Sequence, residues 1–483
     1  MGPRIAFEHL NRITGLAPLT APSFSGAEAV LPSPFRAAEA AAASLGFSAA
    51  VAAEIWRLRG GERQSVSIDL DAAAASLVSF ALLRLDGQSP PRPALDAPAV
   101  GFYRCADGRW IFLHGGFPGQ WPRMLDLLNA LNSKASVAQA VGRWNSLALE
   151  DALGFLNLAG AVARAPHEWA QSPQGRALAK TPPIVIRKIG DAPPLRLGPS
   201  NNPLDGVRAL DLTRVLAGPA CARTLASYGA EALHIRAERL ETIEPFDLDT
   251  GHGKRSAYLD LAHPADAETL RKLVRKAHLF IDSYRPGALA RLGFTPAALA
   301  HIASGITYVS ISCYGLEGPW AGRRGWEQIA QSATGLAHEQ GQFLAVRRGG
   351  KREAAPELIP AAVCDYVTGY LAAAGAAAAL LRRMREGGSW RVEVSLCATA
   401  MWLASLGTIE PGKVPESWAP GEGLDAYRQS CETGRGRLDF LGPVARMSKT
   451  APAWRLPPPE PGADRPRWQD RSEEMHAAEE QSA

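Results

Sequence analysis

The hydrophobic pattern changes near residue 204. From there, short apolar runs of strand length alternate with helix-period segments, beginning with GVRALDL, ACARTLASYGA and EALHIRA. The strand-like runs HLFIDSY and GITYVSISCYG follow, each after a helical segment. Repeated units of this kind predict a parallel sheet with helices on both faces, in which ligands bind at the carboxyl ends of the strands. The expected fold class is α/β, with a Rossmann-like sheet and a smaller α+β domain.

Pro-rich stretches set the predicted domain boundaries. Two of them, at 87–99 and 191–203, enclose the alternating sequence VGFYRCADGRWIFLHGG, which predicts a β-hairpin turning at Asp107-Gly108. We expect five regions: an irregular arm at 1–32, a region with the small α+β domain at 33–200, the Rossmann-like domain at 203–405, a Pro- and Gly-rich closing segment at 406–468, and a disordered tail at 469–483.

An internal repeat links the two parts of the chain. Each copy has an Ala-rich helical segment with an Arg-bearing end, a Gly-Gly pair and an alternating strand, VSIDL in the first copy and VEVSL in the second. When the Gly pairs are superimposed, Asp365 falls on Ala38, so the first copy lacks this carboxylate. The adjacent Glu39 is not equivalent, because a shift of one helical residue turns a side chain through about 100°.

Asp365 stands at the start of an almost wholly apolar segment. From 363 to 381 nearly every residue is small or apolar, so a helix here would be buried and an ionised carboxylate costly unless partnered. One interpretation is that Asp365 caps a helix beginning at about Tyr366. The other is that it is a nucleophile beside the small residues Thr368 and Gly369, since a carboxylate can attack an activated acyl group. The two interpretations are compatible.

The loops after the predicted strands gather positive charge. The segments TRVLAGP, GHGKRS, SYRPGA and CYGLEGP all lie at strand ends, and they or their neighbours carry Lys254, Arg255, Arg285 and Arg291. Such cations suit a ligand with several phosphates. Pro219 is expected at the first position of a helix, which leaves backbone N–H groups for a carbonyl or phosphate. No GxGxxG motif follows the first strand, so a nicotinamide or flavin site is not supported.

Composition narrows the class of protein. The 483 residues are 46% hydrophobic and 21% charged, as expected for a globular protein of two or three domains. A net charge of +4 without basic runs argues against a nucleic-acid partner. The six cysteines lack metal-ligand spacing, so we expect reduced thiols and no metal. The start has no apolar leader, and the Ala-rich run at 361–381 favours a buried core helix over a membrane span, so we expect a cytoplasmic protein.

Five motifs stand in order between about 203 and 400: PLDGVRALDLTRVLAGPACARTLASYGAEALHI, GHGKRSAYLDL, DSYRPGALARLGF, SISCYGLEGPWAGRRGWEQIAQSATG and VCDYVTGYLAAAGAAAALLRR. Together they resemble the class III coenzyme A transferases, relatives of formyl-CoA transferase and carnitine-CoA enzymes. The resemblance implies that Asp365 is the nucleophilic aspartate. It also implies CoA contacts at Val215, Leu216, Ala217, Lys254, Arg255 and Arg291.

The first part of the chain resembles the downstream half of the same family. Residues 33–200 carry RGGERQSVSIDL, YRCADGRW and HEWAQSPQGRALA, and GPVARMSKTAPAW at 442–454 resembles the family's closing segment. The chain is therefore interpreted as a permuted or partly duplicated transferase whose halves rebuild about one family-sized unit. The resemblance implies a homodimer, interlocked within or between chains. HGGFPGQ at 114–120 is a candidate for the family's Gly-rich shielding loop, whereas HIRA at 234–237 departs from its CoA contacts.

The favoured function is transfer of CoA, as a substrate, from an acyl-CoA to a carboxylic acid, with no permanently bound cofactor. Asp365 would form an acyl-aspartyl anhydride and then an aspartyl-CoA thioester, with backbone N–H groups of Gly218 and Gly315 as oxyanion donors. An acyl-CoA racemase needs a His and Asp base pair, but this chain has GWEQ at 325–328 where racemase-type relatives carry histidine. A non-catalytic acyl-CoA-binding protein is the third alternative, favoured by the rearranged order.

Overall fold

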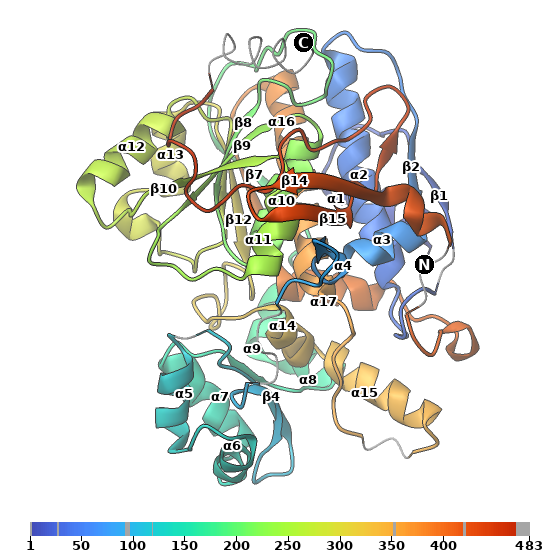
Figure 1. Ribbon diagram of the computed structural model, residues 1–483, viewed down its shortest axis with the longest axis vertical. Helices are drawn as coiled ribbons and strands as arrows, with labels where there is room; N and C mark the ends of the chain where they lie inside the picture. The colour runs from blue at the N-terminus through green and yellow to red at the C-terminus, as the bar shows by residue number, and fades with distance from the viewer. Residues whose placement is uncertain are drawn as a thin grey trace.

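The computed structural model describes residues 2–26, 29–91, 97–117, 119–350, 354–418 and 422–469. A seven-stranded sheet forms the centre of its larger part (Figure 1). Six strands are parallel and the last is an antiparallel edge strand, which confirms the predicted α/β class. In spatial order they are β10 (Lys254–Tyr258), β9 (Glu231–Arg236), β8 (Arg208–Leu212), β11 (Leu279–Asp282), β12 (Thr307–Ser312), β13 (Ser389–Ser395) and β7 (Val185–Gly190).

Helices cover both faces of the sheet, as expected from the strand–helix alternation. On one face lie α12 (Pro264–Val274) and α13 (Pro296–Ile302), whose apolar residues share a core with Leu210 and Leu212 of β8. On the other face lie α10 (Ala217–Ser227) and α16 (Val363–Glu386), which share the larger core with Ala209. Successive residues of β8 thus serve opposite layers, because side chains alternate along a strand.

Two long apolar helices form the middle of the larger core. Helix α2 (Ala37–Leu58) lies against α16 (Figure 1). Both are long and apolar enough to cross a membrane by length and composition, yet 89% of the apolar window of α2 and all of that of α16 are buried inside the fold. The buried core helix expected at 361–381 is therefore confirmed, and α2 is a second helix of the same kind.

The internal repeat is visible as the same succession of elements. After α2 come a Gly-Gly pair, β2 (Val66–Asp69) and α3 (Leu70–Ser76); after α16 come a Gly-Gly pair, β13 and α17 (Leu396–Ser405). In both copies the last residue of the strand caps the next helix, since Asp69 and Ser395 each accept a backbone N–H three residues on. The two copies pack against each other within one chain, through α2 and α16.

The copies differ in the sheets that their strands join. Strand β13 belongs to the central sheet, whereas β2 lies in a separate three-stranded sheet between β1 (Ser23–Ser25) and β16 (Arg446–Met447). The predicted irregular arm at 1–32 was wrong for its first part, because α1 (Pro3–Ile13) packs on α2, with the Phe7 and Phe47 rings 5.9 Å apart. The sequence does carry a helical period here, with Ala6, Phe7 and Leu10 on one buried face, and the prediction overlooked it.

The smaller α+β domain occupies 97–117 and 119–162, which lie within the region 33–200 where it was expected. Its antiparallel sheet has the order β4 (Val100–Arg104), β5 (Trp110–His114) and β6 (Gly160–Val162), and the hairpin turns at Gly108, whose φ is +80°. Figure 1 shows this domain below the central sheet, with α14 between the two. Its helices and the connecting helices are α5 (Trp121–Leu128), α6 (Lys134–Val141), α7 (Ser146–Phe155), α8 (Pro166–Gln171), α9 (Pro173–Leu178), α14 (Glu327–Thr334) and α15 (Leu336–Arg347).

The closing segment contains regular structure that its Pro and Gly content hid. Strands β14 (Arg428–Thr433) and β15 (Gly436–Leu441) form a hairpin that pairs with β3 (Arg84–Leu85). The tail expected at 469–483 lies outside the described residues after its first member. The remaining elements are α4 (Ser79–Leu82), α11 (Glu244–Thr250) and three 3₁₀ turns, η1 (Ala290–Leu292), η2 (Pro411–Lys413) and η3 (Glu422–Tyr427).

One predicted loop is a strand. Lys254 and Arg255 were expected at the carboxyl end of a strand, but they begin β10, where Lys254 is in register with Ala232 near the start of β9. They therefore lie toward the amino ends of the strands. Both side chains are buried in ion pairs, Lys254 with Asp211 and Arg255 with Glu231, which makes the two charges compatible with this edge strand of the sheet.

Gly369 is predicted to set the distance between α10 and α16. A Cβ atom at this residue would lie 2.6 Å from the carbonyl oxygen of Ala217 and 2.8 Å from Cβ of Ala220. Gly369→Ala should therefore lower the free energy of unfolding by about 1–3 kcal/mol, measured by urea denaturation. Gly412→Ala is the matched control, because its Cβ would meet no atom within 4 Å. Equal urea midpoints for the two variants would contradict this close approach.

Candidate active site

A cavity of about 460 Å³ opens where the predicted strand-end loops meet. It is lined by 214–218 after β8, by 283–286 after β11 and by Cys313 after β12. The neighbours of β8 on its two sides, β9 and β11, continue the sheet in opposite directions, so this is the topological switch point at which ligands bind in such sheets. The backbone N–H of Arg214 donates to Ser283 Oγ at 3.2 Å and joins two of the loops.

Both halves of the chain contribute to the cavity. The smaller domain supplies Phe117, Gly119, Gln120 and Arg123, while the rest of the lining comes from the second half. Pro118 lies outside the described residues, but the segment predicted as a shielding loop, at 114–120, reaches the cavity through its other members. The cavity is therefore built between two domains that the sequence separates by about a hundred residues.

Asp365 lines this cavity and is 5% exposed. Helix α16 begins at Val363, so Asp365 is its third residue, and the prediction that it caps a helix starting near Tyr366 was wrong. Among the residues that the structure describes, none forms a hydrogen bond or ion pair with its carboxylate group. The side chain thus faces the cavity with its oxygen atoms available.

The cap of α16 comes from Glu327 on α14. Its Oε2 accepts the backbone N–H of Asp365 at 2.7 Å, and its Oε1 accepts that of Cys364 at 3.1 Å. Gln331, one turn further along α14, donates to Oε1 at 2.7 Å and accepts the backbone N–H of Ile359 at 2.8 Å. The sequence analysis missed Glu327, and only its place after the GW of GWEQ could have drawn attention to it.

The two buried carboxylates raise each other's cost of ionisation. Burial raises the pKa of Asp365 well above its usual value, and the charge of Glu327 raises it further. Burial also raises the pKa of Glu327, although the hydrogen bonds that it accepts act in the opposite direction. A carboxylate with a raised pKa is a more basic and more nucleophilic oxygen once it is ionised.

The first predicted CoA-binding residues, Val215, Leu216 and Ala217, all line the cavity. Val215 has a φ of +71°, which is rare for a β-branched residue and costs about 1–3 kcal/mol. Ala217 begins α10 and Gly218 follows it, so the backbone N–H of Gly218 has no carbonyl partner within the helix. Pro219 is the third helical residue rather than the first.

Lys254 supports the strained loop from below. Its Nζ lies 2.6 Å from Asp211 Oδ2 and donates to the carbonyl oxygen of Pro219 at 2.8 Å. The Thr213 hydroxyl also donates to Asp211, and Nε2 of His234 is 3.0 Å from the carbonyl oxygen of Thr213. Lys254 does not line the cavity. The geometry therefore gives it a role in holding the loop around Val215.

The other residues predicted to contact CoA or an oxyanion also fall into two groups, those that line the cavity and those that do not. Arg285 lines the cavity, whereas Arg291 is exposed on η1 and Arg255 is paired with Glu231 at 2.7 Å, both away from it. Gly218 lines the cavity as expected for an oxyanion donor. Gly315 does not, and its backbone N–H already donates to Ser312 Oγ at 3.1 Å, so that expectation is not supported.

Aromatic rings form one wall. The ring of Trp326 stacks on Phe117 and on His114, with both centroid distances 5.0 Å. Burial lowers the pKa of His114 to about 4, so its ring is neutral near pH 7. No histidine is among the described residues that line the cavity, and the described part of the chain contains no group of three or more His, Cys, Asp or Glu that could hold a metal ion.

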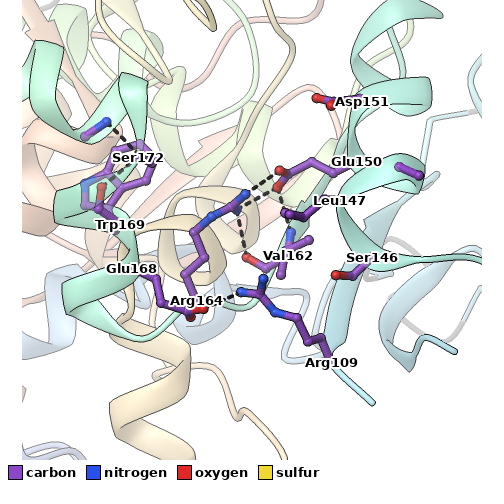
Figure 2. Close-up of polar contacts among 12 residues, drawn as sticks. Arg109, Ser146, Leu147, Glu150, Asp151, Val162, Arg164, Glu168, Trp169 and Ser172 are labelled. Carbon is purple, nitrogen blue, oxygen red and sulfur yellow. Dashed lines mark hydrogen bonds and ion pairs between the residues drawn. The ribbon is translucent and has the colours of Figure 1, made fainter. Parts of the chain in front are cut away.

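Figure 2 shows the polar contacts that Arg164 makes with helix α7 and strand β6 of the smaller domain. The guanidinium of Arg164 makes a two-pronged ion pair with Glu150 of α7, and Glu150 also accepts the backbone N–H of Val162 at 2.8 Å. The same guanidinium lies 4.9 Å from the ring centre of Trp320. Since Trp320 belongs to the loop that continues to Trp326, this buried contact holds the loop against the smaller domain.

The chain belongs to CoA-transferase family III. The model of this family matches residues 12–171 and 204–423, which correspond to the two halves described above. The protein is accordingly an enzyme of the class III CoA-transferase group, as the motifs indicated.

Curated relatives carry names of the same kind. An acyl-CoA transferase of Gibberella moniliformis is 29% identical over 413 residues, which cover 77% of this chain and 71% of the relative. The acetyl-coenzyme A transferase nodX of Hypoxylon pulicicidum is 28% identical over 427 residues, 79% and 71% of the two chains. A formyl-CoA:oxalate CoA-transferase of Rhodopseudomonas palustris is 31% identical over 205 residues, 40% of this chain and 46% of the relative.

Solved structures match part of the chain. A CAIB/BAIF family protein from Brucella suis is 26% identical, with a TM-score of 0.37, over 49% of this chain and 65% of its own. A hypothetical protein from Mycobacterium tuberculosis is 27% identical, with a TM-score of 0.38, over 43% of this chain and 59% of its own.

Lys254→Met is predicted to destabilise the protein strongly. The substitution leaves Asp211 buried without its cation, and removing one partner of a buried ion pair costs roughly 3–5 kcal/mol. Urea denaturation measures the change in the free energy of unfolding. Lys188→Met is the control: its pair with Asp191 is exposed, so the change should stay below about 1 kcal/mol. A loss of similar size in both variants would contradict the supporting role of Lys254.

Proposed function

We propose that the protein transfers CoA from an acyl-CoA to a carboxylic acid through covalent intermediates on Asp365. The observation that carries this proposal is the buried, unpaired Asp365 carboxylate in the cavity at the switch point of the sheet. The family and the names of the relatives support CoA transfer as the activity. The covalent route and the acid substrates are the parts that we propose.

The reaction proceeds in two pairs of steps. An Asp365 oxygen attacks the thioester carbonyl carbon, the carbon–sulfur bond breaks, and the products are an acyl-aspartyl anhydride and CoA thiolate. The thiolate then attacks the aspartyl carbonyl carbon, which releases the first acid as a carboxylate and leaves an aspartyl-CoA thioester. The acceptor carboxylate attacks this thioester, and the returning thiolate takes the acceptor acyl group from the second anhydride. Asp365 is then free again.

The cavity offers favourable electrostatics for these steps. The N-terminal turns of α10 and α16 both reach the cavity, through Gly218 and Asp365, and the positive ends of helix dipoles stabilise the oxyanions that form at each carbonyl carbon. We propose the Gly218 N–H as one oxyanion donor. The aromatic wall of Phe117 and Trp326 excludes water, which would otherwise hydrolyse the anhydride.

CoA itself is proposed to contact Val215, Leu216, Ala217 and Arg285, which line the cavity. Lys254, Arg255 and Arg291 stay sequence-based predictions that this geometry does not favour. A racemase is less well supported, since it needs a proton-transfer base beside the substrate and no described histidine lines the cavity. A purely binding role would not explain why the protein bears the free-energy cost of burying the Asp365 carboxylate.

The homodimer and the cytoplasmic location stay predictions. A single chain brings residues of both halves to one cavity. Sedimentation of the purified protein measures the assembly directly.

Asp365→Ala is predicted to abolish covalent capture. Incubation of the protein with a panel of acyl-CoAs, followed by hydroxylamine, should convert Asp365 into a hydroxamate that peptide mass spectrometry locates. In Asp365→Ala no hydroxamate should form, and CoA transfer should fall by a factor of at least about 10³, as for loss of a covalent nucleophile.

The control for the Asp365→Ala variant is its binding of CoA, measured by calorimetry. CoA should bind to Asp365→Ala, because the substitution removes no cation and shortens a side chain without creating an unpaired buried group. A transfer rate close to that of the unchanged protein would rule out the covalent route and favour the racemase or the binding protein.

The acid limb of the pH–rate profile is predicted to lie above the usual aspartate pKa of 3.8. Asp365 must be ionised to attack and its pKa is raised, so kcat/KM should fall as the pH drops through that raised pKa. Glu327→Gln removes the neighbouring negative charge, lowers the pKa of Asp365 and should move the limb to lower pH. Glu339→Gln, on the exposed side of α15, is the matched control. An unmoved limb in Glu327→Gln would show that the two carboxylates are not coupled.

A further inference from the structure

Positive charge is concentrated around the cavity beyond what the covalent steps need. Besides Asp365, the only acidic residue among the described lining is Glu241. The lining arginines are Arg123, Arg214, Arg239, Arg285, Arg323 and Arg324. A cavity with this balance of charges is suited to anions.

Two of these arginines are neutralised by carboxylates. Arg239 pairs with Asp260 at 2.7 Å, and Arg323 pairs with Asp151 at 2.7 Å. Across the described ranges, none of the other four forms an ion pair with an aspartate or glutamate. They are therefore the lining arginines that have no ion pair within the described part of the chain.

Three of the four are held in place by neutral oxygen atoms. Arg214 donates to the carbonyl oxygen of Glu241 at 2.7 Å, and Arg285 donates to Asn157 Oδ1 at 2.6 Å. Arg123 donates to a backbone carbonyl at the end of α7. Such bonds fix the direction of a guanidinium without cancelling its charge.

Arg324 differs from these three. It is half-buried, its Nε atom is buried without a hydrogen-bond partner, and within the described residues nothing accepts a bond from its guanidinium. Burial lowers its pKa, and the charges of Arg285, Arg123 and Arg214 lower it further, so these three groups lie near enough to repel it. A guanidinium in this position gains most when an anion enters the cavity.

We propose that Arg324 binds a second carboxylate on the acid that gives or receives CoA, so that the substrates are dicarboxylic acids. This inference rests on the proposed CoA transfer. One carboxyl group reacts at Asp365, and the other forms a two-pronged pair with the planar guanidinium of Arg324, a geometry that arginine matches and lysine does not.

The place of Arg324 in the chain favours the acid over the phosphates of CoA. It precedes Trp326 of the aromatic wall by two residues and Glu327 by three, and Glu327 holds the backbone of Asp365 at 2.7 Å. Gly325, the next residue, packs on Cys313, since a Cβ atom at Gly325 would lie 2.3 Å from Cys313 Sγ. Both line the same cavity as Asp365. In an acyl-CoA the whole pantetheine arm separates the thioester from the phosphates, so the group next to the reacting carbonyl is the acyl chain.

The test compares acids of equal carbon number that differ in the second carboxylate. With acetyl-CoA as donor, kcat/KM is measured for malonate, succinate and glutarate against propanoate, butanoate and pentanoate. The unchanged protein should prefer at least one dicarboxylate to its partner acid. Arg324→Gln should lose roughly tenfold to a hundredfold of kcat/KM for that dicarboxylate and less than about threefold for the monocarboxylate. Arg324→Lys should fall between the two.

Two controls separate this role from others. Arg275→Gln removes an exposed arginine at the end of α12, outside the cavity, and should leave the preference unchanged. Binding of CoA, followed by calorimetry, should be the same in Arg324→Gln and in the unchanged protein.

The outcomes are distinct. Equal losses for both classes of acid, or weaker binding of CoA in Arg324→Gln, would overturn the assignment of Arg324 and leave CoA transfer intact. If the unchanged protein transfers CoA to no acid, the proposed function is overturned instead. In that case calorimetric titration of succinate and butanoate tests the Arg324 site alone. The assignment requires that succinate bind more tightly than butanoate to the unchanged protein, and that Arg324→Gln abolish this difference.

Discussion

The rest of the site depends on the two hydrogen bonds that Glu327 accepts from the first turn of α16. These bonds satisfy backbone N–H groups from which an aspartate at the helix start would otherwise accept hydrogen bonds. The Asp365 side chain is therefore left to face the cavity. A capping aspartate has its oxygen atoms engaged and its pKa lowered, both of which weaken a nucleophile. Glu327 thus provides the cap while the Asp365 carboxylate faces the cavity, at the cost of burying both carboxylates. The close crossing of α10 and α16 at Gly369 then brings a second helix N-terminus to the same place.

The loop after β8 shows a similar division of roles. Val215 is strained and touches the cavity, while Lys254 and Asp211 below it are buried and touch nothing in the cavity. A strained residue persists only where its surroundings fix it, and the bonds of Lys254 to Asp211 and to the Pro219 carbonyl provide that constraint. The basic residue that the sequence suggested as a ligand contact is therefore better explained as a part of the scaffold. Its burial distinguishes this supporting cation from a cation that lines the cavity, such as Arg285.

Local sequence signals predicted the sheet, the smaller domain, the hairpin turn at Gly108 and the placement of Asp365 at a helix start. These depend on periodicity and on turn residues, which act over a few positions. The sequence failed where a contact joins distant segments. The segment with Lys254 and Arg255 was predicted to be a loop because the partners of these two charges, Asp211 and Glu231, are remote in the chain. Glu327 was missed for the same reason, since it meets Asp365 across 38 residues. Arg324 could not be told from the neighbouring Arg323 until the structure paired only the latter.

The two halves of the chain share the same succession of elements, but they contribute different residues to one cavity. In the first copy the position of Asp365 is Ala38, the neighbouring Glu39 is paired with Arg36, and β2 lies outside the central sheet. The first half also contributes the smaller domain, whose Phe117 and Gln120 line the cavity together with Asp365. Because α2 and α16 are joined along a buried apolar surface, the two contributions are held in one chain at a fixed distance. The rearranged order of the motifs therefore does not argue against activity, because the half without the aspartate supplies one wall of the cavity that Asp365 lines.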